Sequence, residues 1–185
     1  MKEKIKVWVR NLTKDKDYEI ELPLSEKQLD IKLNPNDEYI IIDSEVFDIG
    51  EYESIDELNK FLIDCKEKEI SIRELEILSH VFLYHEIIEK VKDKNYIIVD
   101  FEEATKGWNY GNGGDIWNAY DKGMCLYDTF VKGKRAYNPF KFYVTANIYE
   151  WIDWESVWRN ATTEGWEAIS LDGYEYLVCR YDNRK

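Results

Sequence analysis

The chain has 185 residues and a formal net charge of −13, from 38 Asp and Glu against 25 Lys and Arg. Its hydrophobic content of 44% and aromatic content of 15% are too high for an acidic disordered tail, so we expect a folded protein with a real core. The charge disfavours direct binding to nucleic acid, because phosphates are repelled by a surface of their own sign. It suits a basic partner, or solubility alone.

Cysteine usage and the apolar pattern indicate in which cellular compartment the protein is expected. Cys65, Cys125 and Cys179 are far apart and show no CxxC spacing, which is typical of reduced intracellular thiols. The opening MKEKIKVWVR contains no apolar signal-peptide core. No apolar run approaches the ~20 residues that span a bilayer. We therefore expect a soluble cytoplasmic protein without membrane association.

Residues 1–53 predict a small α+β domain. The stretch 5–12, IKVWVRNL, alternates apolar and polar residues as a half-buried strand does, and 18–24 is a second strand that can pair with it. Ser25 then begins a helix with a capping-box sequence. The stretch 38–43, EYIIID, is β-branched at its centre and predicts a further strand.

Residues 54–94 predict a helical middle domain. Ser54 and Ser71 each stand three positions before a glutamate, the spacing of a capping box that opens a helix. After Ser71 the apolar pattern continues without a break to Ile88 on two stripes. It predicts one long helix that is covered on two sides.

Residues 95–185 predict a C-terminal α+β domain, and 95–101, NYIIVDF, is its first strand-like run. Asp115 is placed to cap a short helix that ends at Gly123, since aspartate favours helix starts and glycine favours helix ends. The intervening KGWNYGNGGD is rich in glycine and predicts a flexible connection.

Further along, 140–146 alternates like a strand, and Asn147 offers a helix start. Two β-rich runs then flank Asp172 and Gly173, a dipeptide that strongly indicates a β-hairpin. The sequence as a whole predicts an α+β protein with an elongated three-part architecture, whose last part ends in this hairpin.

Metal and catalytic sites are poorly supported. His80 and His85 are five positions apart on the predicted helix, whereas two ligands on one helix face need a spacing of four. The acidic segments lack the calcium-loop pattern, and GNGG lacks the Lys-Ser/Thr of a phosphate loop. With 38 carboxylates some pair is always imaginable, so an acid–base dyad carries little specificity. We expect no enzyme activity, no catalytic residue, no cofactor and no metal.

The acidic residues themselves are unevenly distributed: positions 33–59 hold nine Asp and Glu and no Lys or Arg. Asp56 and Glu57 fall in the first turn of a predicted helix, where the macrodipole favours each carboxylate by ~0.3–1 kcal/mol. The other acids there have no such local reason, and an ordinary solvated face would intersperse both signs. These unexplained acids are Asp43, Glu45, Asp48, Glu51 and Glu53.

Their spacing permits imitation of a polyanion. Alternate strand residues are ~6.6 Å apart and helix neighbours ~5–6 Å apart, close to the ~7 Å between successive phosphates of a nucleic-acid strand. Positions 147–178 are acidic again, with seven acids and one base, Arg159. Three explanations stay open here: a metal or acid–base site, a solvated face, and a surface that imitates a polyanion.

Four stretches resemble the ArdA antirestriction proteins: IKVWVRNL, EYIIIDSE…IGEYESIDELNKF, GDIWNAYDKG and YEWIDWESVWRNATTEGWEAISLDGYEYLV. They span most of the chain in the family's order. The resemblance implies an elongated three-domain homodimer that mimics bent B-form DNA and occupies the DNA-binding groove of type I restriction–modification enzymes. It also implies carriage by a phage, plasmid or other mobile element and action in the bacterial cytoplasm.

On this hypothesis a row of surface carboxylates imitates phosphates. These are Asp43, Glu45, Asp48, Glu51, Glu53, Asp56, Glu57, Asp100, Glu102, Glu103, Asp115, Asp121, Asp153 and Glu155. A basic patch of Lys132, Lys134 and Arg135 interrupts the row, as a solvated loop or a contact with a protein. The alternatives are an acidic anti-CRISPR or adaptor protein that occludes a nuclease without imitating duplex DNA, and a hydrolase with a carboxylate pair.

Overall fold

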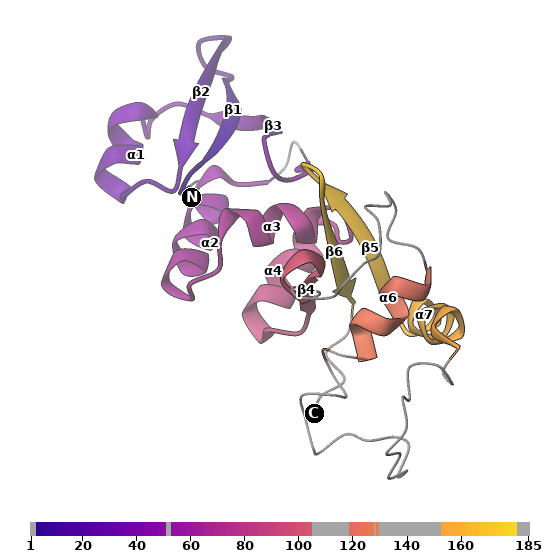
Figure 1. Cartoon of the computed structure of the whole chain (residues 1–185). Coiled ribbons are helices and arrows are strands. Elements are labelled where there is room, and N and C mark those ends of the chain that lie inside the picture. The colour runs from indigo at the N-terminus through magenta and orange to yellow at the C-terminus, as the bar shows by residue number, and fades with distance from the viewer. Residues whose placement is uncertain (1–2, 51–52, 105–118, 128, 130–152, 181–185) are drawn as a thin grey trace. The chain divides into compact units, whose positions relative to one another are not determined.

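The computed structural model describes residues 3–50, 53–104, 119–127, 129 and 153–180. Over these residues the protein is mixed α+β, which confirms the predicted class (Figure 1). The chain divides into two compact units, Met1–Asn95 and Tyr96–Lys185, which are described separately below. The finer division into three parts, with a boundary after residue 53, stays a prediction.

The first unit opens with a three-stranded antiparallel sheet of order β2-β1-β3. Its strands are β1 Ile5–Asn11, β2 Lys16–Leu22 and β3 Tyr39–Ser44. Burial alternates along β1, with Val7 and Val9 fully buried, so the alternation in the sequence does mark one face of a sheet. All three predicted strands of this unit are confirmed.

Four helices belong to the same unit: α1 Glu26–Lys32, α2 Ile55–Glu67, α3 Ile72–Ser79 and α4 Tyr84–Asp93. The helix starts predicted in this unit, at Ser25, Ser54 and Ser71, are confirmed. The Ser54 hydroxyl accepts a hydrogen bond from the Glu57 backbone N–H at 3.5 Å. The Ser71 hydroxyl accepts one from the Glu74 N–H at 3.1 Å.

The prediction of one helix from Ser71 to Ile88 is wrong, because the chain turns between α3 and α4. Leu83 caps α4, and its backbone N–H donates to the Glu86 carboxylate at 2.9 Å. The turn lets Val81 and Phe82 both reach the core while Leu83 stays 59% exposed. His80 ends α3 and His85 lies in α4, so the two histidines are not on one helix.

A polar cluster around the buried Asn11 fastens the turn before β3 to β1. Asn11 is fully buried, and its side-chain amide donates to the Asp37 carboxylate at 2.9 Å. The Lys14 ammonium bonds to the same carboxylate at 2.6 Å. Lys14 first and Asn11 next hold the pKa of Asp37 below its ordinary value.

The second unit contains a three-stranded antiparallel sheet of order β4-β6-β5. Its described elements are β4 Ile97–Asp100, α5 Phe101–Ala104, α6 Ala119–Tyr127, α7 Trp154–Thr163, β5 Trp166–Leu171 and β6 Tyr174–Cys179. Leu171 pairs with Tyr174 across a two-residue turn in which Asp172 and Gly173 have φ of +53° and +83°. The hairpin prediction is confirmed, since such turns need positive φ at both positions.

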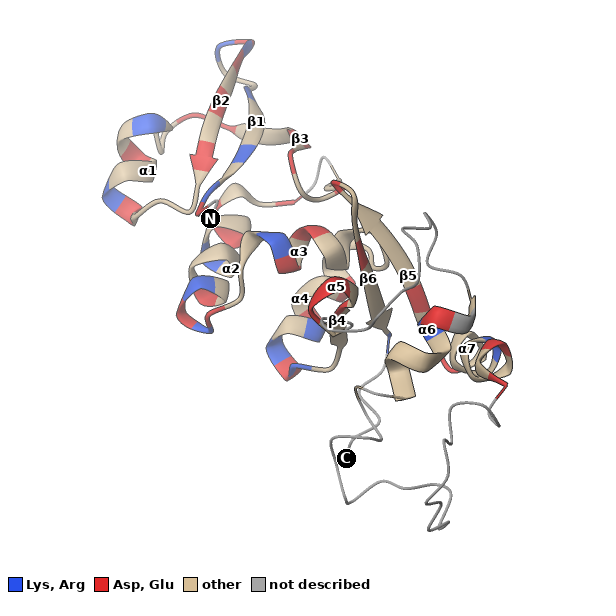
Figure 2. Ribbon diagram, viewed as in Figure 1, with Lys and Arg blue, Asp and Glu red and all other residues tan. Residues whose placement is uncertain are grey.

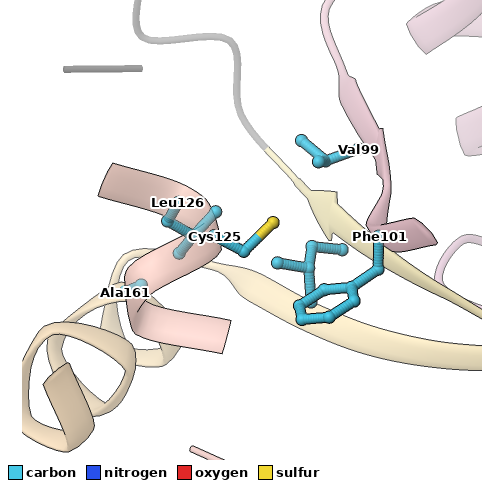
Figure 3. Close-up of a cluster of buried hydrophobic side chains, with 6 residues drawn as sticks. Val99, Phe101, Cys125, Leu126 and Ala161 are labelled. Carbon is cyan, nitrogen blue, oxygen red and sulfur yellow. The ribbon is translucent and has the colours of Figure 1, made fainter. Parts of the chain in front are cut away.

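The core of this unit lies between the sheet and α6 and α7. Phe101 and Leu177 are fully buried there, beside Cys125 and Leu126 of α6 and Ala161 of α7. Figure 3 shows Phe101 and Cys125 directed into this common cluster. Cys65, Cys125 and Cys179 are all buried, and each is a thiol that forms no disulfide.

The prediction that a helix ends at Gly123 is wrong. Gly123 lies inside α6, and a Cβ added there would overlap the carbonyl oxygen of Trp154 and lie 2.9 Å from its carbonyl carbon. The glycine therefore permits close approach of α6 and α7, and it does not act as a C-cap. Asp115, the strand 140–146 and Asn147 lie outside the described residues.

Among the described residues, no helix is long and apolar enough to cross a bilayer.

Candidate functional site

The acidic segment, residues 43–57, connects β3 to the first turn of α2. Asp43, Glu45 and Asp48 are exposed, whereas Phe47 between them is only 3% exposed. Val46 and Ile49 are buried as well. Figure 2 shows acidic residues at the end of β3 and along the loop that follows. The described part of the segment therefore turns its apolar side chains inward and its carboxylates outward.

An aromatic cluster anchors this segment to two helices. The Phe47 ring lies 6.2 Å from the Phe61 ring of α2 and 5.3 Å from the Tyr84 ring of α4, centroid to centroid. The rings of Phe61 and Tyr84 meet edge to face at 6.1 Å. Aromatic pairs of this kind add about 0.5–1.5 kcal/mol beyond the area they bury. The part of the loop around Phe47 is therefore held by packing.

Two carboxylates of the acidic segment, those of Glu53 and Glu57, act on the Tyr84 phenol. Burial raises the pKa of its phenol, and the negative charges of Glu53 and Glu57 raise it further. Glu53 is half-buried, and Glu57 is exposed in the first turn of α2 beside exposed Asp56. The carboxylates of Glu53 and Glu57 are therefore near enough to the Tyr84 phenol for their charges to act on it.

Sequence reasoning missed one base beside the acidic segment. The Lys6 backbone N–H donates to the Glu45 carboxylate at 3.0 Å, across 39 positions of sequence. The pKa of the Lys6 ammonium is raised first by its hydrogen bond to Glu19, and Glu45 adds a smaller effect. Lys6 lies beside Glu45 because β1 pairs antiparallel with β3. A prediction of this strand pairing was the signal that could have found the contact. In the described part of the chain, no ion pair engages Asp43, Asp48, Asp56 or Glu57.

Basic residues gather elsewhere in the unit. The last turns of α1, α2 and α4 carry Lys32, Lys66 and the pair Lys90 and Lys92. Helix dipoles favour acids at first turns and bases at last turns, so part of this separation of charge has a local structural cause. The acids of the loop that precedes α2 lack that cause.

In the second unit, two predicted phosphate mimics are helix caps. The Asp153 carboxylate accepts the Ser156 backbone N–H at 3.1 Å and the Ser156 hydroxyl at 2.6 Å. Asp100 accepts the Glu103 backbone N–H at 3.1 Å. Both carboxylates are exposed, and both have a local role that a sequence reading for N-cap aspartates could have found.

The remaining predicted acids fall into three groups. Glu102, Glu103 and Glu155 are exposed in first turns of their helices, and Asp121 is half-buried in α6. The third group, Glu51 and Asp115, lies outside the described residues. So does the basic patch of Lys132, Lys134 and Arg135. The acids of the first and second units are thus carried on separate compact units.

Substitutions of Asp153 can separate its role as a helix cap from its role as a surface charge. The hydrogen bonds from Ser156 lower the pKa of Asp153, so its contribution to stability is present above the unfolded pKa and is lost as pH falls through the folded pKa. We expect Asp153→Ala to lower the unfolding midpoint, and Asp153→Asn to lower it less, since asparagine also caps helices. Thermal unfolding between pH 2 and 7 measures this, and equal midpoints for both variants at pH 7 would contradict the capping role.

Comparison with known proteins assigns no family to the chain. No family description matches the sequence, and a search of curated proteins finds no matching sequence. Among the described residues, no group of three or more His, Cys, Asp or Glu is placed to hold a metal ion.

Proposed function

We propose that this protein is a non-enzymatic DNA mimic that occupies the DNA-binding groove of a type I restriction–modification enzyme and blocks restriction. The partner is a basic groove, and the protein acts as a homodimer in the cytoplasm of a bacterial host. It uses no cofactor and does not itself bind nucleic acid.

The observation that carries the proposal is the acidic segment. Its carboxylates at Asp43, Asp48, Asp56 and Glu57 are exposed, and they take part in no ion pair among the described residues. Phe47 anchors the part of the segment around it, so little conformational freedom is lost there when a partner binds. A basic groove that takes up such a surface gains electrostatic complementarity as it does from DNA.

The resemblance to the ArdA proteins supports the same proposal from the sequence. Its four stretches include the opening strand, the acidic segment and the terminal hairpin, in the family's order. On this proposal the exposed carboxylates of the second unit, such as Glu102 and Glu155, continue the imitation beyond the first unit.

A second candidate is an acidic anti-CRISPR or adaptor protein that occludes a nuclease without imitating duplex DNA. Asp100 and Asp153 favour it, because each carboxylate is engaged in a helix cap and is less free to act as a phosphate. Such a protein needs only a few carboxylates in contact with its partner, whereas a mimic needs a long row.

Competition with DNA tests the proposal. A purified type I enzyme is assayed for cleavage of unmodified DNA with and without the protein, and with excess short duplex at several salt concentrations. We expect duplex to displace the protein, and its apparent affinity to fall by at least about tenfold between 50 and 200 mM salt. Inhibition that resists both duplex and salt would favour occlusion and would sink the mimicry proposal.

A further inference from the structure

Asn59 is a buried polar residue in the middle of α2, with only 6% of its surface exposed. Its side-chain oxygen accepts the Leu24 backbone N–H at 2.7 Å, and its side-chain nitrogen donates to the Leu24 carbonyl at 2.9 Å. The two residues are 35 positions apart. One amide side chain therefore satisfies both polar groups of a single distant residue.

Leu24 needs this partner because it lies between two elements. β2 ends at Leu22 and α1 begins at Glu26, so the Leu24 N–H and carbonyl are in neither the strand ladder nor the helix. Leu24 is only 5% exposed, and buried backbone polar groups without partners destabilise a fold. The backbone N–H must face an acceptor and the carbonyl a donor, which fixes the orientation of the Asn59 amide.

Few side chains can replace Asn59. Leucine has similar size but offers neither donor nor acceptor, and an ionised aspartate offers acceptors only. An ion pair between Glu3, just before β1, and Lys66 of α2 also links the sheet to this helix, at 3.9 Å. Both side chains are exposed, and exposed ion pairs contribute little to stability. The contact between Asn59 and Leu24 is buried and specific in direction.

We propose that Asn59 is a positioning residue that makes the β2-β1-β3 sheet and helices α2–α4 one cooperative unit. It holds Asp43 and Glu45, at the end of β3, in fixed relation to Asp56 and Glu57 of α2. The cooperative unit is inferred from the contacts of Asn59 alone. The functional importance of holding these carboxylates in fixed relation rests on the proposed function.

Hydrogen exchange of the full chain tests the cooperative unit. In the native protein, the slowest amides of β1 and β2 are expected to exchange together with those of α2. Asn59→Leu leaves the Leu24 groups without partners, so β1 and β2 should exchange about tenfold or more faster than α2. Val91→Ala is the matched control: it empties a buried site in α4 and leaves the hydrogen bonds between Asn59 and Leu24 in place, so it should accelerate both parts together.

Asn59→Asp keeps the test decisive where Asn59→Leu fails to fold. A buried carboxyl takes up a proton readily, and once protonated it can donate to the Leu24 carbonyl as asparagine does. Its protection of β1 and β2 relative to α2 should therefore recover as pH is lowered towards 5. Joint acceleration of all elements by both Asn59 variants, or no change, would overturn the proposal.

The inhibition assay separates the two statements. At equal folded fraction, Asn59→Leu should lose at least about tenfold more apparent affinity for the restriction enzyme than Val91→Ala. Equal losses would overturn the positioning role while the exchange data still decide cooperativity. If the native protein is not displaced by duplex, the proposed function fails, and the exchange result on the cooperative unit is unaffected.

Discussion

Neutralising five carboxylates of the acidic segment is expected to abolish inhibition of a type I restriction–modification enzyme. The variant combines Asp43→Asn, Asp48→Asn, Glu53→Gln, Asp56→Asn and Glu57→Gln. Each substitution alone should be nearly silent, since exposed charges contribute little singly and are screened by salt. The five together remove the attraction on which the salt-dependent part of binding rests. The measurement is the protein concentration that halves DNA cleavage.

The matched control removes the same charge from other surfaces. Its five changes are Glu26→Gln, Asp30→Asn, Glu67→Gln, Glu69→Gln and Asp93→Asn, all at exposed positions of α1 or near the ends of α2 and α4. We expect this control to inhibit almost as well as the native protein. If both variants lose inhibition equally, net charge alone matters. Full inhibition by the first variant would sink the mimicry idea.

Gly123→Ala is expected to be among the most destabilising single substitutions in the second unit. The added methyl group would overlap the Trp154 carbonyl oxygen and lie 3.2 Å from the Trp158 backbone nitrogen. Both obstacles are backbone atoms of α7, so α6 and α7 must separate. Overpacking of this kind costs about 1–3 kcal/mol or more. Urea unfolding followed by tryptophan fluorescence measures the loss, because Trp154 and Trp158 lie beside the site.

Two other glycines provide controls for this result. A Cβ at Gly50 would meet no atom within 4 Å, and Gly50→Ala should change stability by less than about 1 kcal/mol. Gly173 also has open space, but its φ of +83° strains any other residue by about 1–2 kcal/mol. A Gly123→Ala variant as stable as Gly50→Ala would show that the close approach of α6 and α7 is not required.

Features that depend on a few neighbouring residues could be predicted from the sequence. The alternation in β1, the capped helix starts at Ser54 and Ser71, and the turn at Asp172 and Gly173 all lie where they were expected. Each is set by interactions within four positions along the chain, or by the backbone preference of single residues. The exposure of Asp43, Glu45 and Asp48 likewise follows from their charge.

Features that depend on distant partners were decided only by the tertiary structure. The sequence pattern predicts that a helix ends at Gly123. The Trp154 backbone lies so close to this position that glycine is needed inside the helix. The helical pattern runs through residues 80–83, but the core takes Val81 and Phe82 only if the chain turns there. Lys6 reaches Glu45 across 39 positions, and Asn59 reaches Leu24 across 35. Periodicity reports which face of an element is apolar, whereas these outcomes depend on which atoms another segment places against that face.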